Sequence, residues 1–215
     1  MAIFLDSANP RDATEAFSFG FIAGVTTNPR LLASQGAEPL RTIEEIAKCS
    51  SGPIFYQPMG QTAKAMVEEM QRAHQLLGDR LVAKIPCCPD GFLAVSELRD
   101  ELTCAMTTVF SAAQVYAAAC AGCRYALPYL NRMTRLGGDG AAVVQRMADI
   151  VAITELELVV ASIRSVEEIE QAILAGAAHV TVPLAVLREL IDHPLSRQAI
   201  AEFATAARGL ARRRR

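Results

Sequence analysis

The segment LVAKIP, residues 81–86, is a short apolar run with one basic side chain inside it. A near-continuous apolar run of this length is typical of a strand that is buried on both faces of a parallel sheet. The segment therefore predicts a buried strand that carries Lys84 in its middle, where an isolated charge is costly.

Seven further apolar runs of this kind occur along the chain, at residues 3–8, 23–28, 53–59, 102–109, 125–130, 157–163 and 179–184. Nearly every gap between them holds a segment whose apolar residues recur at three- and four-residue spacing, which is typical of helices. Examples lie at 62–77, 111–122, 140–151 and 165–176, and several end in glycine. No linker or low-complexity stretch divides the chain, so the pattern predicts a single α/β domain over residues 1–215.

Eight strand–helix repeats predict a (β/α)₈ TIM barrel. A doubly wound open sheet is the alternative fold. Such a sheet would more often carry a glycine-rich phosphate loop after its first strand, whereas this chain has LDSANP there and no G-x-G-x-x-G or P-loop motif.

The composition argues against several classes of function. The net charge is −2, so no overall field favours nucleic acid or membrane, and no apolar run reaches the roughly 18 residues that a membrane span needs. The start, MAIFLDSANP, lacks a basic region, so we expect no signal peptide and a cytoplasmic location. The six cysteines are then expected to be free thiols, and the lone CAGC motif at 120–123 to be packing rather than a redox or zinc site.

Lysine is rare in this chain, which has 21 basic residues but only Lys48, Lys64 and Lys84. The first two lie in amphipathic, charge-bearing stretches. A desolvated lysine can become a neutral amine nucleophile, unlike arginine, which stays protonated. The alternative is a lysine at a strand edge whose ammonium reaches water.

Polar residues gather at the ends of seven consecutive predicted strands, where a barrel of this type carries its chemistry. They are Asp6, Thr26, Thr27, Asn28, Gln57, Lys84, Thr107, Tyr129, Arg132 and Ser162. Their common position favours a functional role for Lys84.

These residue types suit aldol chemistry through a covalent intermediate. A neutral lysine attacks a ketone to form an iminium, which accepts electrons when the neighbouring carbon–carbon bond breaks. Asp6 is the candidate acid/base, and a water that moves protons is expected at Gln57, Thr107 and Tyr129. The candidates for substrate binding are Thr26 and Asn28 for hydroxyl groups, with Arg132, Ser162 and Arg164 for a phosphate.

Five motifs, FLDSAN, GVTTNP, VAKIP, PYLNR and ASIR, resemble those of the transaldolase family, and best its small subgroup that contains fructose-6-phosphate aldolase. The resemblance covers essentially the whole chain with the motifs in the same order. It implies a TIM barrel and a class I aldolase without metal or cofactor. It also implies that Lys84 is the Schiff-base lysine, Asp6 its acid/base partner and Asn28 a substrate-binding residue.

The resemblance further implies sugar phosphate substrates and a homo-oligomer, a pentamer or decamer. In such relatives the C-terminal helix reaches a neighbouring subunit, and residues 193–210 would form that helix here, followed by a basic tail at 211–215.

Two positions distinguish the aldolases of this family from its transaldolases. Typical transaldolases have Glu on the third strand and Phe on the sixth, and this chain resembles the aldolases in having Gln57 and Tyr129. Ala105 and Leu127 also stand where transaldolases have Asn and Ser. The departures from the subgroup are Arg30 in place of a small residue, the bulk of Leu127, and Met106 and Thr108. They leave the donor and acceptor preferences open.

Four functions are therefore open. The first is an aldolase that makes or breaks the C3–C4 bond of a ketose phosphate, with a dihydroxyacetone-type donor and an aldehyde acceptor that Arg164 predicts to be phosphorylated. The second is a transaldolase that transfers the same three-carbon unit. The third is a barrel that binds sugar phosphates without turnover, which would not need Lys84, Asp6 and Tyr129 together. The fourth is nucleic-acid contact through 212–215, which the net charge and the lack of interleaved aromatic residues oppose.

Overall fold

The computed structural model describes the backbone of residues 1–213 and the side chains of residues 1–208. The side chains of the predicted basic tail, 211–215, therefore lie outside the described residues.

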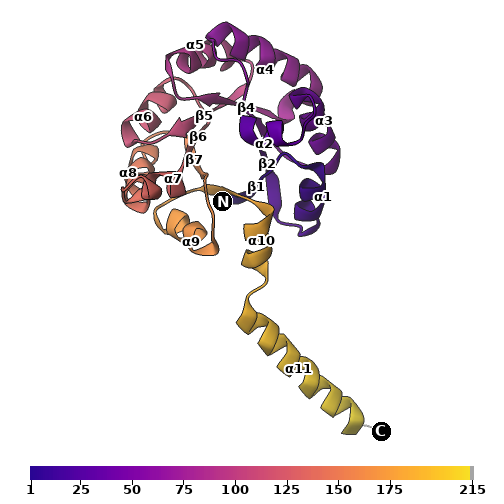
Figure 1. Cartoon of the computed structure of the whole chain (residues 1–215). Helices are drawn as coiled ribbons and strands as arrows, with labels where there is room; N and C mark the ends of the chain where they lie inside the picture. Colours follow the sequence, from indigo (N-terminus) through magenta and orange to yellow (C-terminus); the bar gives the residue numbers. More distant parts are fainter. Residues whose placement is uncertain (214–215) are drawn as a thin grey trace.

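The eight strands pair in parallel and close into a barrel in chain order, which confirms the predicted (β/α)₈ fold (Figure 1). They are β1 (Ala2–Asp6), β2 (Ile22–Thr26), β3 (Ile54–Tyr56), β4 (Leu81–Pro86), β5 (Thr103–Val109), β6 (Tyr125–Pro128), β7 (Glu157–Val160) and β8 (His179–Val182). Most end two or three residues earlier than the apolar runs predict, because the last residues of each run already belong to the following loop.

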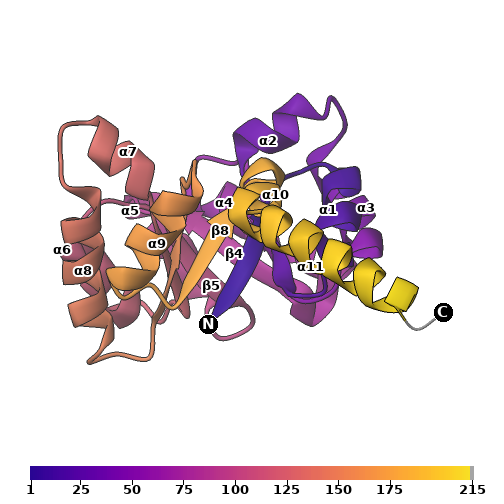
Figure 2. The ribbon, with the colours of Figure 1, turned by 90° about the horizontal axis from the view of Figure 1, so that it is seen from below.

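Helices cover the outside of the barrel. They are α1 (Pro10–Ser18), α2 (Pro29–Ser34), α3 (Pro39–Cys49), α4 (Ala63–Leu77), α5 (Pro89–Leu98), α6 (Ala112–Cys120), α7 (Leu130–Arg135), α8 (Gly140–Val151), α9 (Val166–Leu174), α10 (Leu184–Ile191) and α11 (Pro194–Arg213), with a 3₁₀ turn, η1 (Gly78–Arg80), between α4 and β4. The short helices α2 and α7 stand above the end of the barrel where the strands finish (Figure 2).

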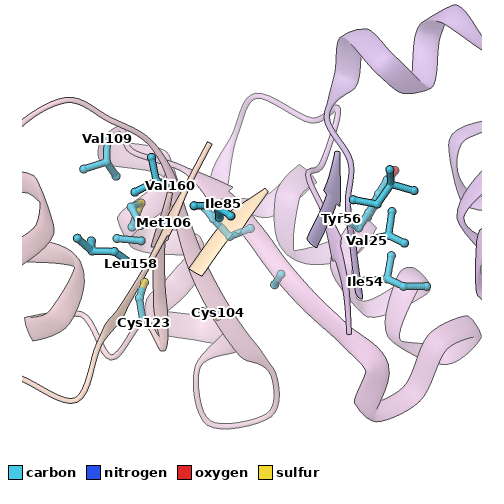
Figure 3. Packing of buried hydrophobic residues seen from close by; sticks show 14 of the residues in the cluster. Val25, Ile54, Tyr56, Ile85, Cys104, Met106, Val109, Cys123, Leu158 and Val160 are labelled. Carbon is cyan, nitrogen blue, oxygen red and sulfur yellow. The ribbon is translucent and has the colours of Figure 1, made fainter. Parts of the chain in front are cut away.

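Two apolar layers hold the barrel together, because alternate residues of a strand point to opposite faces. Outward residues such as Ile54, Tyr56 and Ile85 pack between the strands and the helices (Figure 3). The inward layer is a separate buried cluster that fills the floor of the barrel: Phe4, Phe55, Val82, Ala105, Leu127 and Val159.

The floor cluster sets the position of the polar residues above it. Two residues further along the chain, on the same face, come the polar residues Asp6, Gln57, Lys84, Thr107 and Tyr129, together with Ala161. The period of two thus places an apolar floor beneath a ring of polar side chains.

Gly91 in α5 allows that helix to start close against the end of β4. A Cβ atom at this position would lie 1.9 Å from the carbonyl oxygen of Pro86, a contact that no other residue could make. The close approach holds the end of the strand that carries Lys84.

The last helix, α11, extends away from the barrel (Figures 1 and 2). It begins one residue after the predicted start of the C-terminal helix, and Leu195, Ile200 and Phe203 on it are 68%, 65% and 73% exposed. Among the helices of the described residues, none combines the length and apolar character needed to cross a membrane.

Candidate active site

A cavity of about 540 Å³ opens at the end of the barrel where the strands finish. Its lining includes every predicted site residue except Thr107: Asp6, Thr26, Asn28, Gln57, Lys84, Tyr129, Arg132, Ser162 and Arg164. Thr107 is buried beside it. The cavity is also lined by residues that were not predicted as site residues, among them Arg30, Thr108, Ala161 and Pro183.

Lys84 points from β4 into the barrel and is 3% exposed. Its Nζ donates a 2.7 Å hydrogen bond to the carbonyl oxygen of Thr27. Burial lowers the pKa of Lys84 from 10.5 to about 8, although the nearby charge of Asp6 opposes that change. With this pKa, about a tenth of the amine is neutral at pH 7 and about half at pH 8. The alternative of a lysine whose ammonium reaches water is wrong, because the side chain is buried.

Asp6 ends β1 on the same inward face. Burial raises the pKa of its carboxyl group, while Lys84, the hydroxyl of Thr26 and Arg164 act in the opposite direction. The Thr26 hydroxyl donates to Asp6 Oδ1 at 3.2 Å and lies 2.7 Å from the hydroxyl of Thr181. Because a hydroxyl has one proton, Thr181 is then the donor to Thr26. The chain from Thr181 to Asp6 fixes the orientation of the carboxylate.

Tyr129 follows β6, and its hydroxyl lies 3.0 Å from that of Thr107 on β5. Burial raises the pKa of Tyr129, against the effects of Thr107 and Arg132, so the phenol is protonated at neutral pH. The ring is held edge-on by Phe110 at 5.7 Å between centroids, and the guanidinium of Arg132 lies 4.9 Å above it. The protonated hydroxyl of Tyr129 is therefore held in a fixed position at the cavity wall.

Gln57 follows β3, and its Oε1 is a buried side-chain atom without a hydrogen-bond partner among the described residues. A buried amide oxygen without a partner is uncommon and suits a site that binds water or a ligand hydroxyl.

The loop after Gln57 is fixed by a buried carboxylate on α4. Glu69 accepts hydrogen bonds from the hydroxyl of Tyr56 and from the backbone N–H groups of Met59 and Gly60, at 2.5 to 3.1 Å. Glu69 was not predicted from the sequence. The available signal was an acidic residue among the apolar positions of the 62–77 segment.

The Asn28 side chain has two roles in the structure. Its Oδ1 accepts a 3.0 Å hydrogen bond from the N–H of Leu31 and so caps α2. Its NH₂ group has no partner among the described residues and is free to donate.

Three further predicted residues line the cavity: Arg132 on α7, and Ser162 and Arg164 in the loop between β7 and α9. Ser162 has a φ of 60°, a left-handed conformation that is uncommon outside glycine and that concentrates at functional sites. Neither guanidinium forms an ion pair within the described residues.

Two positions at which this chain differs from transaldolases lie below the cavity rather than on its wall. Ala105 and Leu127 are fully buried in the floor cluster, directly beneath Thr107 and Tyr129. Thr108 does line the cavity, with a φ of 59°, and its hydroxyl accepts from the N–H of Cys87 at 3.1 Å.

Comparison with known proteins identifies the family. The model of the Transaldolase/Fructose-6-phosphate aldolase family matches residues 3–213. The chain belongs to this family. It is therefore an enzyme of the transaldolase family, as the resemblance predicted.

Curated relatives agree over nearly the full length. A probable transaldolase of Clostridioides difficile (strain 630) is 34% identical over 206 residues, which cover 94% of this chain and 95% of the relative. A probable transaldolase of Bacillus anthracis is 35% identical over the same length, with the same coverage.

Solved structures show a likeness of fold alone. A putative phosphonomutase from Burkholderia cenocepacia aligns with a TM-score of 0.62 at 11% identity, over 96% of this chain and 92% of that one. A mandelate oxidase variant aligns with a TM-score of 0.61 at 16% identity, over 86% and 64%. Both are too distant to carry an argument about chemistry.

Proposed function

We propose that this enzyme is a class I aldolase that cleaves and forms the C3–C4 bond of a ketose phosphate through a Schiff base on Lys84. The observation that carries the proposal is the buried Lys84 amine, with its lowered pKa, in a cavity that also contains Asp6 and Tyr129. A neutral, desolvated amine is the form that attacks a ketone.

The reaction begins when Lys84 Nζ attacks the C2 carbonyl and the carbinolamine loses water to give an iminium. Asp6 takes the proton of the C4 hydroxyl as the C3–C4 bond breaks, and the electron pair moves to the iminium to give an enamine. The aldehyde leaves, C3 is protonated, and water hydrolyses the new iminium to release dihydroxyacetone. Gln57, Thr107 and Tyr129 hold the water and supply protons in the dehydration and hydrolysis steps.

Substrate binding is assigned to the residues around this centre. The NH₂ group of Asn28 donates to a substrate hydroxyl, while Thr26 orients Asp6 beside it. Ser162, Arg132 and Arg164 bind the phosphate of the acceptor through charge-assisted hydrogen bonds. No step here needs a cofactor.

Transfer is the second candidate reaction, because the relatives carry the name transaldolase. The two reactions share every step up to the enamine. They differ in whether an aldehyde or water then takes the three-carbon unit. Tyr129 and Gln57 favour water, since both can position it beside the iminium.

Borohydride trapping tests the proposal. The protein is incubated with dihydroxyacetone or with fructose 6-phosphate, reduced, digested and mapped by mass. A three-carbon adduct on Lys84 is expected with either compound. Lys48 and Lys64, the other two lysines, are exposed and paired with glutamates, and they serve as internal controls.

A Lys84→Met variant controls for non-specific reduction. No adduct on Lys84 in a folded wild-type protein would overturn the Schiff-base proposal. Measuring free dihydroxyacetone without and with added glyceraldehyde 3-phosphate then separates hydrolysis from transfer.

We also propose that the enzyme forms a homo-oligomer in which α11 packs on a second copy. The support is the exposure of Leu195, Ile200 and Phe203 on a helix that leaves the barrel (Figure 1). Exposed side chains of this size on one helix are typical of a protein interface. A cytoplasmic location stays a prediction.

A further inference from the structure

The proposed phosphate site is built from two separate segments of the chain. Arg132 lies on α7, which follows β6, whereas Ser162 and Arg164 lie in the loop between β7 and α9. Charge-assisted contacts to one phosphate depend on the distance and direction of each donor. The two segments therefore have to be held in a fixed position relative to each other.

Backbone hydrogen bonds join α7 to the first part of this loop. The N–H of Leu130 donates to the carbonyl oxygen of Ala161 at 3.0 Å, and the N–H of Asn131 donates to that of Ser162 at 3.1 Å. Ser162 has a φ of 60°, a strained conformation that persists only where the surroundings hold it. Within the described residues these backbone bonds do not extend to Arg164, two residues further along the chain.

A carboxylate on α9, which lies beside α7 (Figures 1 and 2), makes the connection to Arg164. Glu168 Oε2 accepts a 2.6 Å hydrogen bond from the backbone N–H of Arg164. Its Oε1 accepts another, also of 2.6 Å, from the side-chain NH₂ group of Asn131, which directly precedes Arg132. Glu168 does not line the cavity, so its contacts are with the segments that carry the guanidinium groups.

The start of α9 has the sequence pattern of a capping box, in which a serine and a glutamate three residues later each accept from the other's backbone N–H. Ser165 caps α9, and its hydroxyl accepts from the N–H of Glu168 at 3.3 Å. Within the described residues, however, the carboxylate accepts not from Ser165 but from Arg164 and Asn131. A residue of a local motif thus contacts a segment 37 residues away in the chain.

We propose that Glu168 is a positioning residue for the phosphate site, which fixes Arg164 and Arg132 at the spacing at which both bind one phosphate. Glu168 acts by accepting hydrogen bonds and not by its charge, since a carboxylate near two guanidinium groups weakens their attraction for a phosphate. This inference rests on the proposed function for the identity of the ligand, but the hydrogen bonds of Glu168 do not depend on Schiff-base formation.

Carbonyl-free ligands test the proposal, because they cannot react with Lys84. Calorimetric titration compares glucitol 6-phosphate with glucitol, so that the difference between them measures the phosphate contacts. We expect Glu168→Ala to bind glucitol 6-phosphate about tenfold more weakly than the wild type, the scale of one charge-assisted hydrogen bond. Trapping of uncharged dihydroxyacetone on Lys84 should proceed at the wild-type rate, because the covalent centre stays in place.

Two further variants separate position from charge. Glu168→Gln should bind glucitol 6-phosphate as the wild type does, since the amide oxygen can accept from Arg164 while the Asn131 amide turns over to accept from the new NH₂ group. Glu170→Ala is the matched control: Glu170 lies on the same helix, is exposed and does not line the cavity. It removes the same charge and should also keep the wild-type affinity.

Wild-type affinity in Glu168→Ala would overturn the proposal, as would an equal loss in Glu168→Gln, which would assign the effect to charge. Slower trapping of dihydroxyacetone in Glu168→Ala would also overturn it, because the change would then extend beyond the phosphate site. Failure of the proposed reaction gives a different result. In that case the wild type forms no adduct on Lys84, while the loss in Glu168→Ala and its recovery in Glu168→Gln still show the role of Glu168.

Discussion

Lys84 Nζ donates a 2.7 Å hydrogen bond to the carbonyl oxygen of Thr27, just after β2, across the inside of the barrel. This is the only side-chain hydrogen bond of Lys84 within the described residues. A neutral amine keeps an N–H group for it and leaves its lone pair free, whereas an ammonium would bury further donors without partners. Burial therefore opposes protonation, and the contact with Thr27 orients the nucleophile.

The rate of adduct formation should depend on pH with a midpoint near 8. Lys84 has its pKa lowered to about 8, so the reactive neutral form increases as pH rises through that value. We expect the second-order rate of trapping by dihydroxyacetone to fall about tenfold for each unit below pH 7 and to level off above pH 9. Incubation with dihydroxyacetone for set times at a series of pH values, each ended by borohydride reduction, measures this rate. A midpoint near 10.5 would show an ordinary exposed lysine.

The free energy of unfolding should also depend on pH because of the lowered pKa of Lys84. The pKa of Lys84 is lower in the folded than in the unfolded chain, so the unfolded state binds more protons between pH 8 and 10.5. The buried lysine therefore lowers the free energy of unfolding by about 3 kcal/mol below pH 8, and this penalty disappears as pH rises to 10.5.

The comparison with Lys84→Met isolates that penalty. The free energy of unfolding of the wild type minus that of the variant should rise by about 3 kcal/mol between pH 7 and pH 10.5. Denaturant unfolding at both pH values measures this difference, in which the other titrating groups cancel. A constant difference would mean that Lys84 is not desolvated.

Glu69→Gln should destabilise the protein and disturb the loop after Gln57. The carboxylate accepts from Tyr56 and from two backbone N–H groups, and an amide has one acceptor oxygen and a donor group that faces other donors. A loss of about 2 kcal/mol is expected, measured by denaturant unfolding.

The matched control for that change is Glu68→Gln on the same helix. Glu68 is exposed and lies 3.8 Å from Lys64 in a surface ion pair. Its removal should change the free energy of unfolding by less than about 0.5 kcal/mol. Similar losses in both variants would contradict the role given to Glu69.

The fold could be predicted from the sequence because strands buried on both faces leave an unmistakable apolar run. The strand ends could not, since nothing in the residue types after Asp6 and Thr26 marks the point at which the backbone leaves the strand and turns toward the next helix. The ring of polar side chains could also be predicted, because the strand ends converge in any barrel of this type.

Two supporting residues were hidden for physical reasons. Thr181 is a single hydroxyl inside an apolar strand, and only the closure of β8 onto β1 brings it to Thr26. Glu69 stands among the apolar positions of α4, but the groups that it contacts depend on how α4 packs under the loop after β3, which one sequence does not show.

Tyr129→Phe should shift the enzyme from hydrolysis toward transfer. The variant loses the hydroxyl that lies 3.0 Å from Thr107 but keeps the ring that packs on Phe110. Release of free dihydroxyacetone should fall by about 100-fold, the scale of one acid/base group, while the trapped adduct on Lys84 persists.

An enzymatic assay for dihydroxyacetone, run beside the trapping experiment, checks the Tyr129→Phe prediction. Tyr116→Phe is the control, because Tyr116 lies exposed on α6, away from the cavity. If the variant loses both the adduct on Lys84 and the release of dihydroxyacetone, Tyr129 instead acts in the step that forms the carbon–nitrogen bond.

The exposed apolar side chains of α11 should be required for assembly. Ile200 and Phe203, three residues apart, lie on neighbouring positions of the helix, and burying each is worth about 2 kcal/mol. The double variant Ile200→Ser, Phe203→Ser should therefore sediment as a smaller species than the wild type. Gln198→Ser with Glu202→Ser changes two exposed residues of the same helix that contact each other at 2.9 Å, and it should leave the mass unchanged. If the wild type and both double variants sediment as monomers, α11 has no second copy as its partner; if only the polar pair matters, the interface is electrostatic.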